Sequence, residues 1–265
     1  MDIFSMKEHY TIEDLLVIMR LLRSENGCPW DREQTHESIR HNFLEETYEV
    51  LDAIDKKDAS LLKEELGDVL LQVVFHARME EEAGRFGFDD VCDGICKKLI
   101  VRHPHVFGSV DADTADQVLK NWDEIKKQTK GQKTATDTIN DVPRAFPALM
   151  RSQKVQHRAA RAGFDWDDIG GTIDKLREEV DELSYAIERD EPAERKQEEL
   201  GDVLFAAVNV ARFLKVDGEE TLERACDKFA GRFSKLEQLC AARGIEMKTA
   251  SVEQLDKLWE EVKTM

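Results

Sequence analysis

Residues 64–78 read EELGDVLLQVVFHAR, and residues 198–212 read EELGDVLFAAVNVAR. Each stretch places a glycine and an aspartate at the head of an apolar run, which is unusual for a helix that packs in a core. Apolar residues recur at helical spacing through most of the chain, and alternating runs rich in Val, Ile and Thr are missing. This pattern predicts an all-α protein with about five helices in each half and no significant β-sheet.

The two halves share more than this stretch. The matching elements, in the same order, are Trp30-Asp31 and Trp166-Asp167, EETYE (45–49) and EEVDE (178–182), EELGD (64–68) and EELGD (198–202), Lys98/Arg102 and Lys228/Arg232, and Trp122/Lys126 and Trp259/Lys263. Such an ordered set predicts a tandem duplication. The polar segment KKQTKGQKTATDTINDVP (126–143) has the composition of a linker. We therefore predict an N-terminal domain over 1–126, a linker over 127–143 and a C-terminal domain over 144–265.

Four acidic residues in each half are predicted to converge, because residues three apart lie on one helix face. They are Glu46, Glu49, Glu65 and Asp68 in the first half, and Glu179, Glu182, Glu199 and Asp202 in the second. Two interpretations are open. Glutamate-rich helix faces are commonly solvated. However, Asp68 and Asp202 lie at the edge of apolar runs, where a carboxylate withdrawn from water needs a partner or a metal.

A set of carboxylate oxygens is typical of Mg²⁺, with Mn²⁺ as a substitute. No histidine follows these glutamates three residues later, which argues against a ferritin-like di-iron site. The neighbouring Gly67 and Gly201 have two explanations. Either glycine lets a second helix or a ligand approach closely, or it only relieves packing. We predict a magnesium site in each half.

Cations and tryptophans at helical spacing accompany both acidic sets. Lys and Arg can neutralise phosphate oxygens, and a tryptophan can stack on a base. The residues are Lys228, Arg232, Trp259 and Lys263 in the second half, and Lys98, Arg102, Trp122 and Lys126 in the first. Each alone is more simply a solvated charge or a core residue, and their recurrence favours nucleotide binding. The His103-Pro104-His105 segment is a weaker metal candidate, because the second half has no counterpart.

Composition narrows the choice of function classes. The formal charge of −18 repels nucleic-acid phosphates, so we expect no nucleic-acid partner. No apolar run approaches the roughly 18 residues of a membrane span, and we expect no signal peptide. The five cysteines lack C-x-x-C spacing and are expected to be reduced thiols of a cytoplasmic protein. Phosphate-loop, serine-hydrolase and Rossmann motifs are missing.

The chain contains EExxE followed by ELGD twice, CPWD near the start and a KxxxR segment after each repeat. In these motifs it resembles the MazG family of nucleoside triphosphate pyrophosphohydrolases, which belongs to the all-α NTP pyrophosphatase superfamily. The resemblance runs from Leu15 to Lys263. It implies tandem domains of the four-helix-bundle type and a homodimer whose second copy completes each site. It also implies Mg²⁺-dependent hydrolysis of NTPs and dNTPs to monophosphate and pyrophosphate. Where the motifs match, the resemblance implies that the four acidic residues of each half are metal ligands. It also implies that the Lys, Arg and Trp residues named above contact the nucleotide.

In such a reaction, a water activated by metal and a carboxylate attacks the α-phosphorus. Glu178 and Glu179 are candidate bases. The halves differ seven residues after the shared aspartate, where the second has Asn209 and the first has Phe75. An amide there can hydrogen-bond a phosphate, a sugar or a metal-bound water, and a phenyl ring cannot. We therefore hypothesise that the second half is the principal catalytic unit. The alternative is a non-catalytic bundle that binds nucleotides or a partner protein and holds Mg²⁺ structurally.

Overall fold

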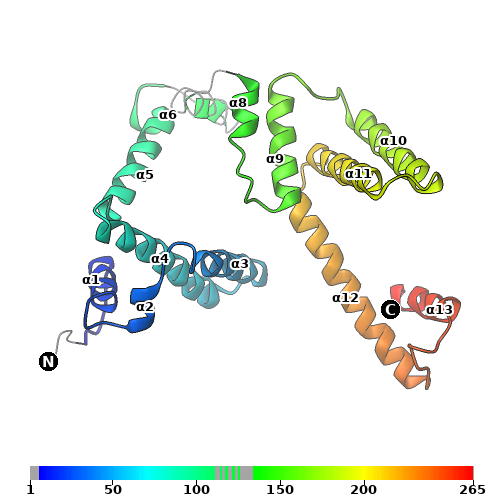
Figure 1. Cartoon of the computed structure of the whole chain (residues 1–265), viewed down its shortest axis with the longest axis horizontal. Coiled ribbons are helices and arrows are strands. Elements are labelled where there is room, and N and C mark those ends of the chain that lie inside the picture. Colours follow the sequence, from blue (N-terminus) through cyan, green and yellow to red (C-terminus); the bar gives the residue numbers. More distant parts are fainter. Residues whose placement is uncertain are drawn as a thin grey trace. The chain divides into compact units, whose positions relative to one another are not determined.

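The computed structural model describes residues 6–110, 114, 117–118, 121–122, 125 and 134–264. All regular elements in these ranges are helices, which confirms the all-α prediction (Figure 1). The chain divides into two compact units, Met1–Lys126 and Lys127–Met265. Within the described ranges, every helix is too short or too polar to cross a lipid bilayer.

The first unit is organised around a helical hairpin. Its helices are α1 (Ile12–Leu22), α2 (Pro29–Glu33), α3 (Arg40–Lys56), α4 (Ala59–Glu82), α5 (Phe88–Arg102) and α6 (Pro104–Phe107). The hairpin consists of α3 and α4, and both α1 and α5 pack on α4. The chain reverses at Lys57, which ends α3 in a left-handed conformation with a φ of 55°. Asp58 then caps α4 by accepting hydrogen bonds from the backbone N–H groups of Ser60 and Leu61.

A small apolar core holds α1 and the start of α3 against the second half of α4. Its buried members are Met19, Ile39, Val74, Phe75 and Met79. The N-terminus of α1 has a capping box, in which the backbone N–H of Thr11 donates to Asp14 over 3.0 Å. The α3–α4 hairpin extends beyond this core, so its acidic motifs lie outside this apolar cluster.

The second unit repeats the hairpin and adds a long helix. Its helices are α8 (Ala135–Asn140), α9 (Ala148–Arg161), α10 (Ile169–Glu188), α11 (Ala193–Phe213), α12 (Gly218–Ala242) and α13 (Val252–Lys263). Here α10 and α11 form the hairpin, and α9 packs on α8, α11 and α12. At the far end of α12, α13 folds back on it (Figure 1). A second apolar core of Leu236, Cys240, Leu258 and Val262 holds this pair together.

Helix α8 lies inside the segment that we predicted as a linker. Thr134 starts it, because its side chain accepts a hydrogen bond from the backbone N–H of Asp137 while Asp137 caps the backbone of Thr134 in return. A polar segment without apolar periodicity can therefore still form a short helix where a capping box and a neighbouring helix support it.

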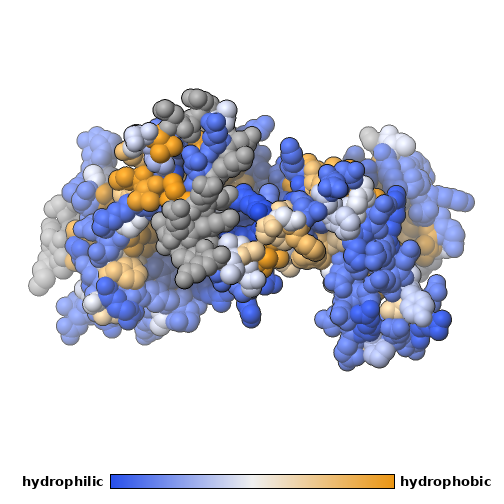
Figure 2. Space-filling model, turned by 90° about the horizontal axis from the view of Figure 1, so that it is seen from above, coloured by the Kyte–Doolittle hydropathy of each residue, from blue (hydrophilic) through white to orange (hydrophobic). Residues whose placement is uncertain are grey.

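Both hairpins expose apolar side chains. Leu66 and Leu70 on α4 are exposed, as are Leu200 and Leu204 on α11. Figure 2 shows patches of hydrophobic residues that reach the molecular surface. Burying such side chains stabilises an assembly by removing apolar area from water.

Candidate functional site

The hairpin of the second unit gathers three carboxylates. Glu179 from α10 and Glu199 and Asp202 from α11 each offer an oxygen, and these oxygens lie within 4.8 Å of one another. We call these residues the second acidic cluster. Glu199 is only 2% exposed. Burial raises the pKa of Glu199, Arg195 opposes the shift, and the neighbouring carboxylates add to it.

Two cations contact this cluster from the same two helices. The Nζ atom of Lys175 lies 2.8 Å from Glu179 and 2.8 Å from Glu178. Arg195 pairs with Glu199 and also lies 2.9 Å from Glu198. Sequence reasoning missed both cations, although each precedes a cluster carboxylate by one helical turn. The spacings K-x-x-x-E and R-x-x-x-E in the sequence would have indicated that both cations lie beside the cluster.

An open cleft with a volume of about 710 Å³ lies between α10 and α11 beside the cluster. Its walls include Glu178, Glu182, Tyr185, Arg195 and Glu199. Glu182, the fourth predicted ligand, lines this cleft without joining the cluster. The cleft is strongly acidic, so an anionic ligand would enter it only together with cations.

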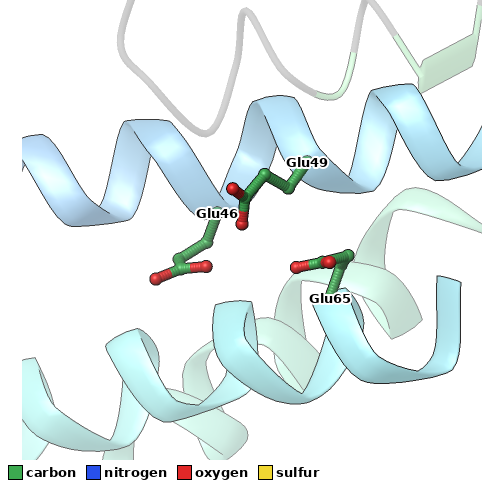
Figure 3. A group of neighbouring side chains, drawn as sticks. All are labelled: Glu46, Glu49 and Glu65. Carbon is green, nitrogen blue, oxygen red and sulfur yellow. The ribbon is translucent and has the colours of Figure 1, made fainter. Parts of the chain in front are cut away.

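The hairpin of the first unit builds a similar but unpaired group. Glu46 and Glu49 from α3 and Glu65 from α4 offer oxygens within 4.8 Å of one another, and Figure 3 shows their side chains gathered between the two helices. We call them the first acidic cluster. Burial and then the charge of Asp68 raise the pKa of Glu46. Burial and then the charge of Glu49 raise that of Glu65.

No lysine or arginine among the described residues pairs with the first acidic cluster. The positions that correspond to Lys175 and Arg195 are occupied by Asn42 and Leu61. Among the described residues, repulsion within this cluster is therefore offset by no ion pair, whereas in the second cluster Lys175 and Arg195 offset it. The structure leaves Asp68, a predicted ligand, outside the three-residue group.

The two motif glycines do not mediate close helix packing within the chain. A Cβ atom added at Gly67 or at Gly201 would meet no atom within 4 Å. The expectation that a neighbouring helix of the same chain approaches closely there is therefore wrong. Close approach of a ligand or of a second copy remains a prediction.

The predicted nucleotide contacts of the second unit lie on α12 and α13. Helix α12 follows the C-terminal end of α11, and α13 packs on α12 (Figure 1). The ring of Trp259 is 5.2 Å from that of Phe229, and Lys263 pairs with Glu260. Among described residues, no hydrogen bond or ion pair joins the cations Lys228, Arg232 and Lys263 to the second acidic cluster.

The corresponding residues of the first unit follow the same pattern. Lys98 and Arg102 lie on α5, and the guanidinium of Arg102 lies 5.8 Å from the ring centre of Trp122. Lys126 lies outside the described residues. Among the residues that the structure describes, no hydrogen bond or ion pair therefore joins Lys98, Arg102 or Trp122 to the first acidic cluster.

Asn209 lies in a separate aromatic pocket of about 300 Å³. The pocket is lined by residues that include Gln156, Trp166, Phe205, Asn209 and Arg212. The Oδ1 atom of Asn209 accepts a hydrogen bond of 2.9 Å from Arg212, which also pairs with Asp165. Asn209 is two helical turns, about 10 Å, beyond Asp202. Phe75, its counterpart, is 5% exposed and belongs to the first core.

A sequence model described as the MazG nucleotide pyrophosphohydrolase domain matches residues 34–107 and 170–236. The chain belongs to the MazG family. Each matched region contains one hairpin with its acidic cluster and the helix that follows, which confirms the predicted tandem arrangement. The resemblance inferred from the motifs is likewise confirmed.

Three named proteins are similar in sequence to this chain, two of them over nearly their whole length and one over half of it. The chain is 48% identical over 254 residues to the nucleoside triphosphate pyrophosphohydrolase of Escherichia coli K12, covering 95% of this chain and 97% of that protein. It is 45% identical over 251 residues to the nucleoside triphosphate pyrophosphohydrolase/pyrophosphatase MazG of Thermotoga maritima, covering 95% of each. It also matches the uncharacterized protein YabN of Bacillus subtilis at 45% identity, covering 93% of this chain and 50% of YabN.

Proposed function

We propose that this MazG protein is a Mg²⁺-dependent nucleoside triphosphate pyrophosphohydrolase that releases a nucleoside monophosphate and pyrophosphate. The observation that carries the proposal is the second acidic cluster, in which buried Glu179 and Glu199 and exposed Asp202 lie together with two cations beside an open cleft. The relatives from E. coli and T. maritima, both named as nucleoside triphosphate pyrophosphohydrolases, support it.

The donor set of the second acidic cluster fits Mg²⁺. All its ligands are oxygens, they converge within 4.8 Å, and burial and mutual repulsion raise the pKa of Glu199. Glu179, Glu199 and Asp202 would hold the ion, with Glu182 available from the cleft wall. Bound Mg²⁺ supplies positive charge to the phosphate oxygens and makes water more acidic. Mn²⁺ has similar ligand preferences and could substitute.

The protein's own side chains then bind the substrate and move a proton. Lys175 and Arg195 exchange their carboxylate partners for phosphate oxygens as the triphosphate enters the cleft. Glu178 faces the cleft and is not part of the acidic cluster, so it can accept the proton from the attacking water. Glu179 is the alternative base, but as a ligand it has less freedom to take a proton. Attack at the α-phosphorus expels pyrophosphate in line.

The base of the nucleotide fits the aromatic pocket. Asn209 in this pocket lies about two helical turns beyond Asp202 along α11, which is a suitable span for a sugar and phosphates. Trp166 offers a ring for stacking, and the side-chain amides of Gln156 and Asn209 offer hydrogen-bonding groups. Asn209 therefore contributes to binding of the base and not of the metal.

We infer that the active form is a homodimer. Lys228 and Arg232 lie on α12, away from the acidic cluster of their own chain, and α11 and α12 expose Leu204, Phe229 and Phe233. In a dimer, these apolar side chains become buried, and the cations of one copy reach the cleft of the other. The second unit is the principal catalytic unit, because no lysine or arginine among the described residues pairs with the first acidic cluster.

Product analysis tests the proposed reaction. The full-length protein is incubated with Mg²⁺ and each of the eight common NTPs and dNTPs, and the phosphate products are separated. The expected products are monophosphate and pyrophosphate, and EDTA abolishes their release. Diphosphate with inorganic phosphate would contradict the proposal. No product from any nucleotide would instead favour the non-catalytic binding protein.

The five free thiols and the free nucleotides as substrates fit a cytoplasmic protein.

A further inference from the structure

Two histidines of the first unit form a close pair that the proposed reaction does not use. His36 lies in the segment between α2 and α3, and His76 lies on α4. Their Nδ1 atoms are 2.7 Å apart, their ring centres are 5.0 Å apart, and their planes differ by 4°. Parallel rings stacked face to face keep their atoms about 3.5 Å or more apart. The two rings therefore meet edge to edge in one plane, with one nitrogen aimed at the other.

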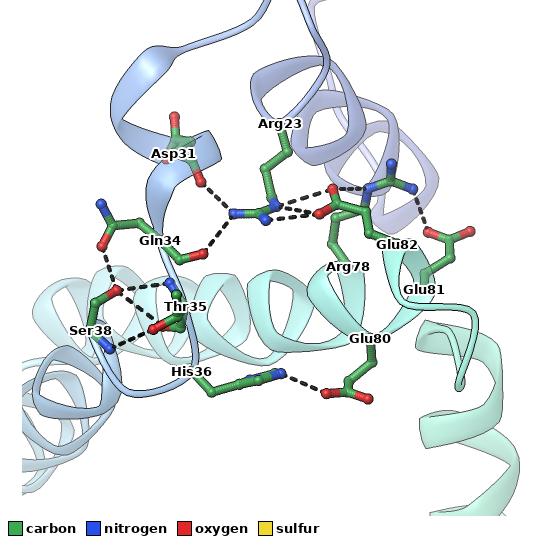
Figure 4. A network of polar contacts seen from close by, with 10 residues as sticks. All are labelled: Arg23, Asp31, Gln34, Thr35, His36, Ser38, Arg78, Glu80, Glu81 and Glu82. Carbon is green, nitrogen blue, oxygen red and sulfur yellow. Dashed lines mark hydrogen bonds and ion pairs between the residues drawn. The ribbon is translucent and has the colours of Figure 1, made fainter.

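A carboxylate fixes the orientation of His36 from the opposite side of its ring. The Oε1 atom of Glu80 lies 2.6 Å from Nε2 of His36, as Figure 4 shows. Arg85 hydrogen-bonds to Glu80 and, together with His36, lowers the pKa of Glu80 to about 2, so this side chain remains a carboxylate. An anionic acceptor requires a proton on Nε2 of His36. The Nδ1 atom of neutral His36 then carries a lone pair directed at His76.

His76 is also suited to be neutral. Burial and then the charge of His36 lower the pKa of His76, and the ring of Phe43 lies 5.8 Å from it. Neutral imidazole nitrogen is the commonest protein ligand for Zn²⁺, Cu²⁺ and Ni²⁺. A histidine that binds such a metal usually donates its other N–H group to a carboxylate, which is the relation between His36 and Glu80.

We propose that His36 and His76 bind a divalent transition metal such as Cu²⁺ or Zn²⁺ between their Nδ1 atoms, with Glu80 as the carboxylate behind His36. Two nitrogens bound at about 2.1 Å in a tetrahedral site are roughly 3.4 Å apart. The pair therefore has to open by less than 1 Å, roughly, from its present separation, and each ring has to turn by about 35° so that both lone pairs point at the metal. The side chain of His36 is 38% exposed, so it can move and water can occupy the remaining positions.

Such a metal would attach the segment before α3 to α4. That segment is already ordered by a reciprocal turn, in which the backbone N–H of Thr35 donates to Ser38 over 2.9 Å and the backbone N–H of Ser38 donates to Thr35 over 3.3 Å (Figure 4). The metal would add a second attachment, and because it binds the folded state, it would raise thermal stability. The site is independent of the acidic clusters, which offer oxygen ligands only.

Copper titration of the full-length protein tests the proposal without nucleotide. Excess Mg²⁺ is present to occupy the acidic clusters, and Cu²⁺ binding is followed by electron paramagnetic resonance. We expect one tight site whose spectrum shows coupling to two imidazole nitrogens. His36→Phe and His76→Phe should remove this site, and Glu80→Gln should weaken binding by about 10-fold.

Two control variants separate this pair from other histidines. His41→Phe changes an exposed histidine nearby on α3, and His105→Phe changes a residue whose ring is 5.6 Å from that of His103 at a tilt of 55°. Both controls should retain the site. Circular dichroism in EDTA checks the folding of each variant, and His36→Phe, at the more exposed position, keeps the test valid if His76→Phe unfolds. An unchanged spectrum in His36→Phe, or a spectrum with oxygen ligands only, would overturn the proposal.

Discussion

The two acidic clusters share their motifs but not their surroundings. In the second unit, Lys175 and Arg195 contact the carboxylates. In the first, Asn42 and Leu61 occupy those positions, and burial and repulsion raise the pKa of Glu46 and of Glu65. A duplicated motif has therefore retained the ability to gather oxygens, while among the described residues only the second copy pairs them with cations. Gathering carboxylates and pairing them with cations are separable properties of this hairpin.

The largest expected effect comes from removing one proposed metal ligand of the second acidic cluster. Glu179→Ala should lower kcat by about 100-fold or more, because metal-assisted charge stabilisation contributes several kcal/mol to the transition state. Glu46→Ala, the matched change in the first unit, should leave kcat nearly unchanged. The measurement is the rate of pyrophosphate release. If Glu46→Ala abolished pyrophosphate release and Glu179→Ala left it unchanged, our assignment of the catalytic unit would be reversed.

Removing a cation should separate nucleotide binding from metal binding. Lys175→Met should raise KM for the nucleotide by roughly 10-fold or more, because a hydrogen bond to a charged group is lost. Without nucleotide, the same variant should bind Mg²⁺ at least as tightly as the unmodified protein, since Lys175 no longer competes for Glu179. Steady-state kinetics and calorimetry measure the two effects. Asn42→Met is the matched control, and a weaker Mg²⁺ affinity in Lys175→Met would mean that this lysine only supports the fold.

Equivalent tryptophans test whether the aromatic pocket binds the base. Trp166→Ala should raise KM by about 10-fold, because stacking of one base on an aromatic ring contributes about 1–3 kcal/mol. Trp30→Ala changes the matching residue of the first unit, which is exposed, and should leave KM unchanged. Kinetics with several nucleotides provide the readout. Equal effects of both changes would remove the distinction between the two units.

The smallest expected effect is on stability and depends on pH. The pKa of Glu65 is raised in the folded protein, so the folded state holds its proton more tightly than the unfolded state. The stabilisation that results from this difference in the pKa of Glu65 is present below the ordinary glutamate pKa. It is lost as pH rises through the pKa of Glu65 in the folded protein. In EDTA at neutral pH, Glu65→Gln should therefore raise Tm by about 2 °C. The difference should vanish at acid pH and should shrink or reverse with Mg²⁺.

Glu199→Gln is the matched comparison in the second unit. Burial also raises the pKa of Glu199, but Arg195 opposes that shift. Replacing this glutamate removes repulsion and leaves Arg195 without one of its partners, so the gain in Tm should be smaller. A larger gain than in Glu65→Gln would show that the ion pair contributes little to relieving the charge of the second cluster.

Short-range geometry explains which parts of the site could be predicted from sequence. Pairs such as Glu199 and Asp202 share a helix face because they are three residues apart, and the preceding helix lies alongside because the connection is short. The cations one turn earlier follow the same rule and could have been found. The all-α fold and the duplication follow from similarly local patterns.

Longer-range relations could not be read in this way. Asn209 lies on the same face of α11 as Asp202, but it is about 10 Å farther along the helix axis. Whether Asn209 meets a metal or a base depends on what packs above it, and the structure places Trp166 and Arg212 there. Likewise, the distance of Lys228 from the acidic cluster depends on the direction in which α12 leaves the hairpin, which no residue pattern specifies.

The direction of α12 has a genetic consequence. If the cations on this helix serve the cleft of a second copy, a defect in the cluster and a defect in α12 lie in different halves of one site. Chains carrying Glu179→Ala and chains carrying Arg232→Ala, each inactive as a pure dimer, would form mixed dimers in which one cleft has an intact cluster and receives intact cations. Co-expressing the two alleles would then restore activity that neither allele has alone.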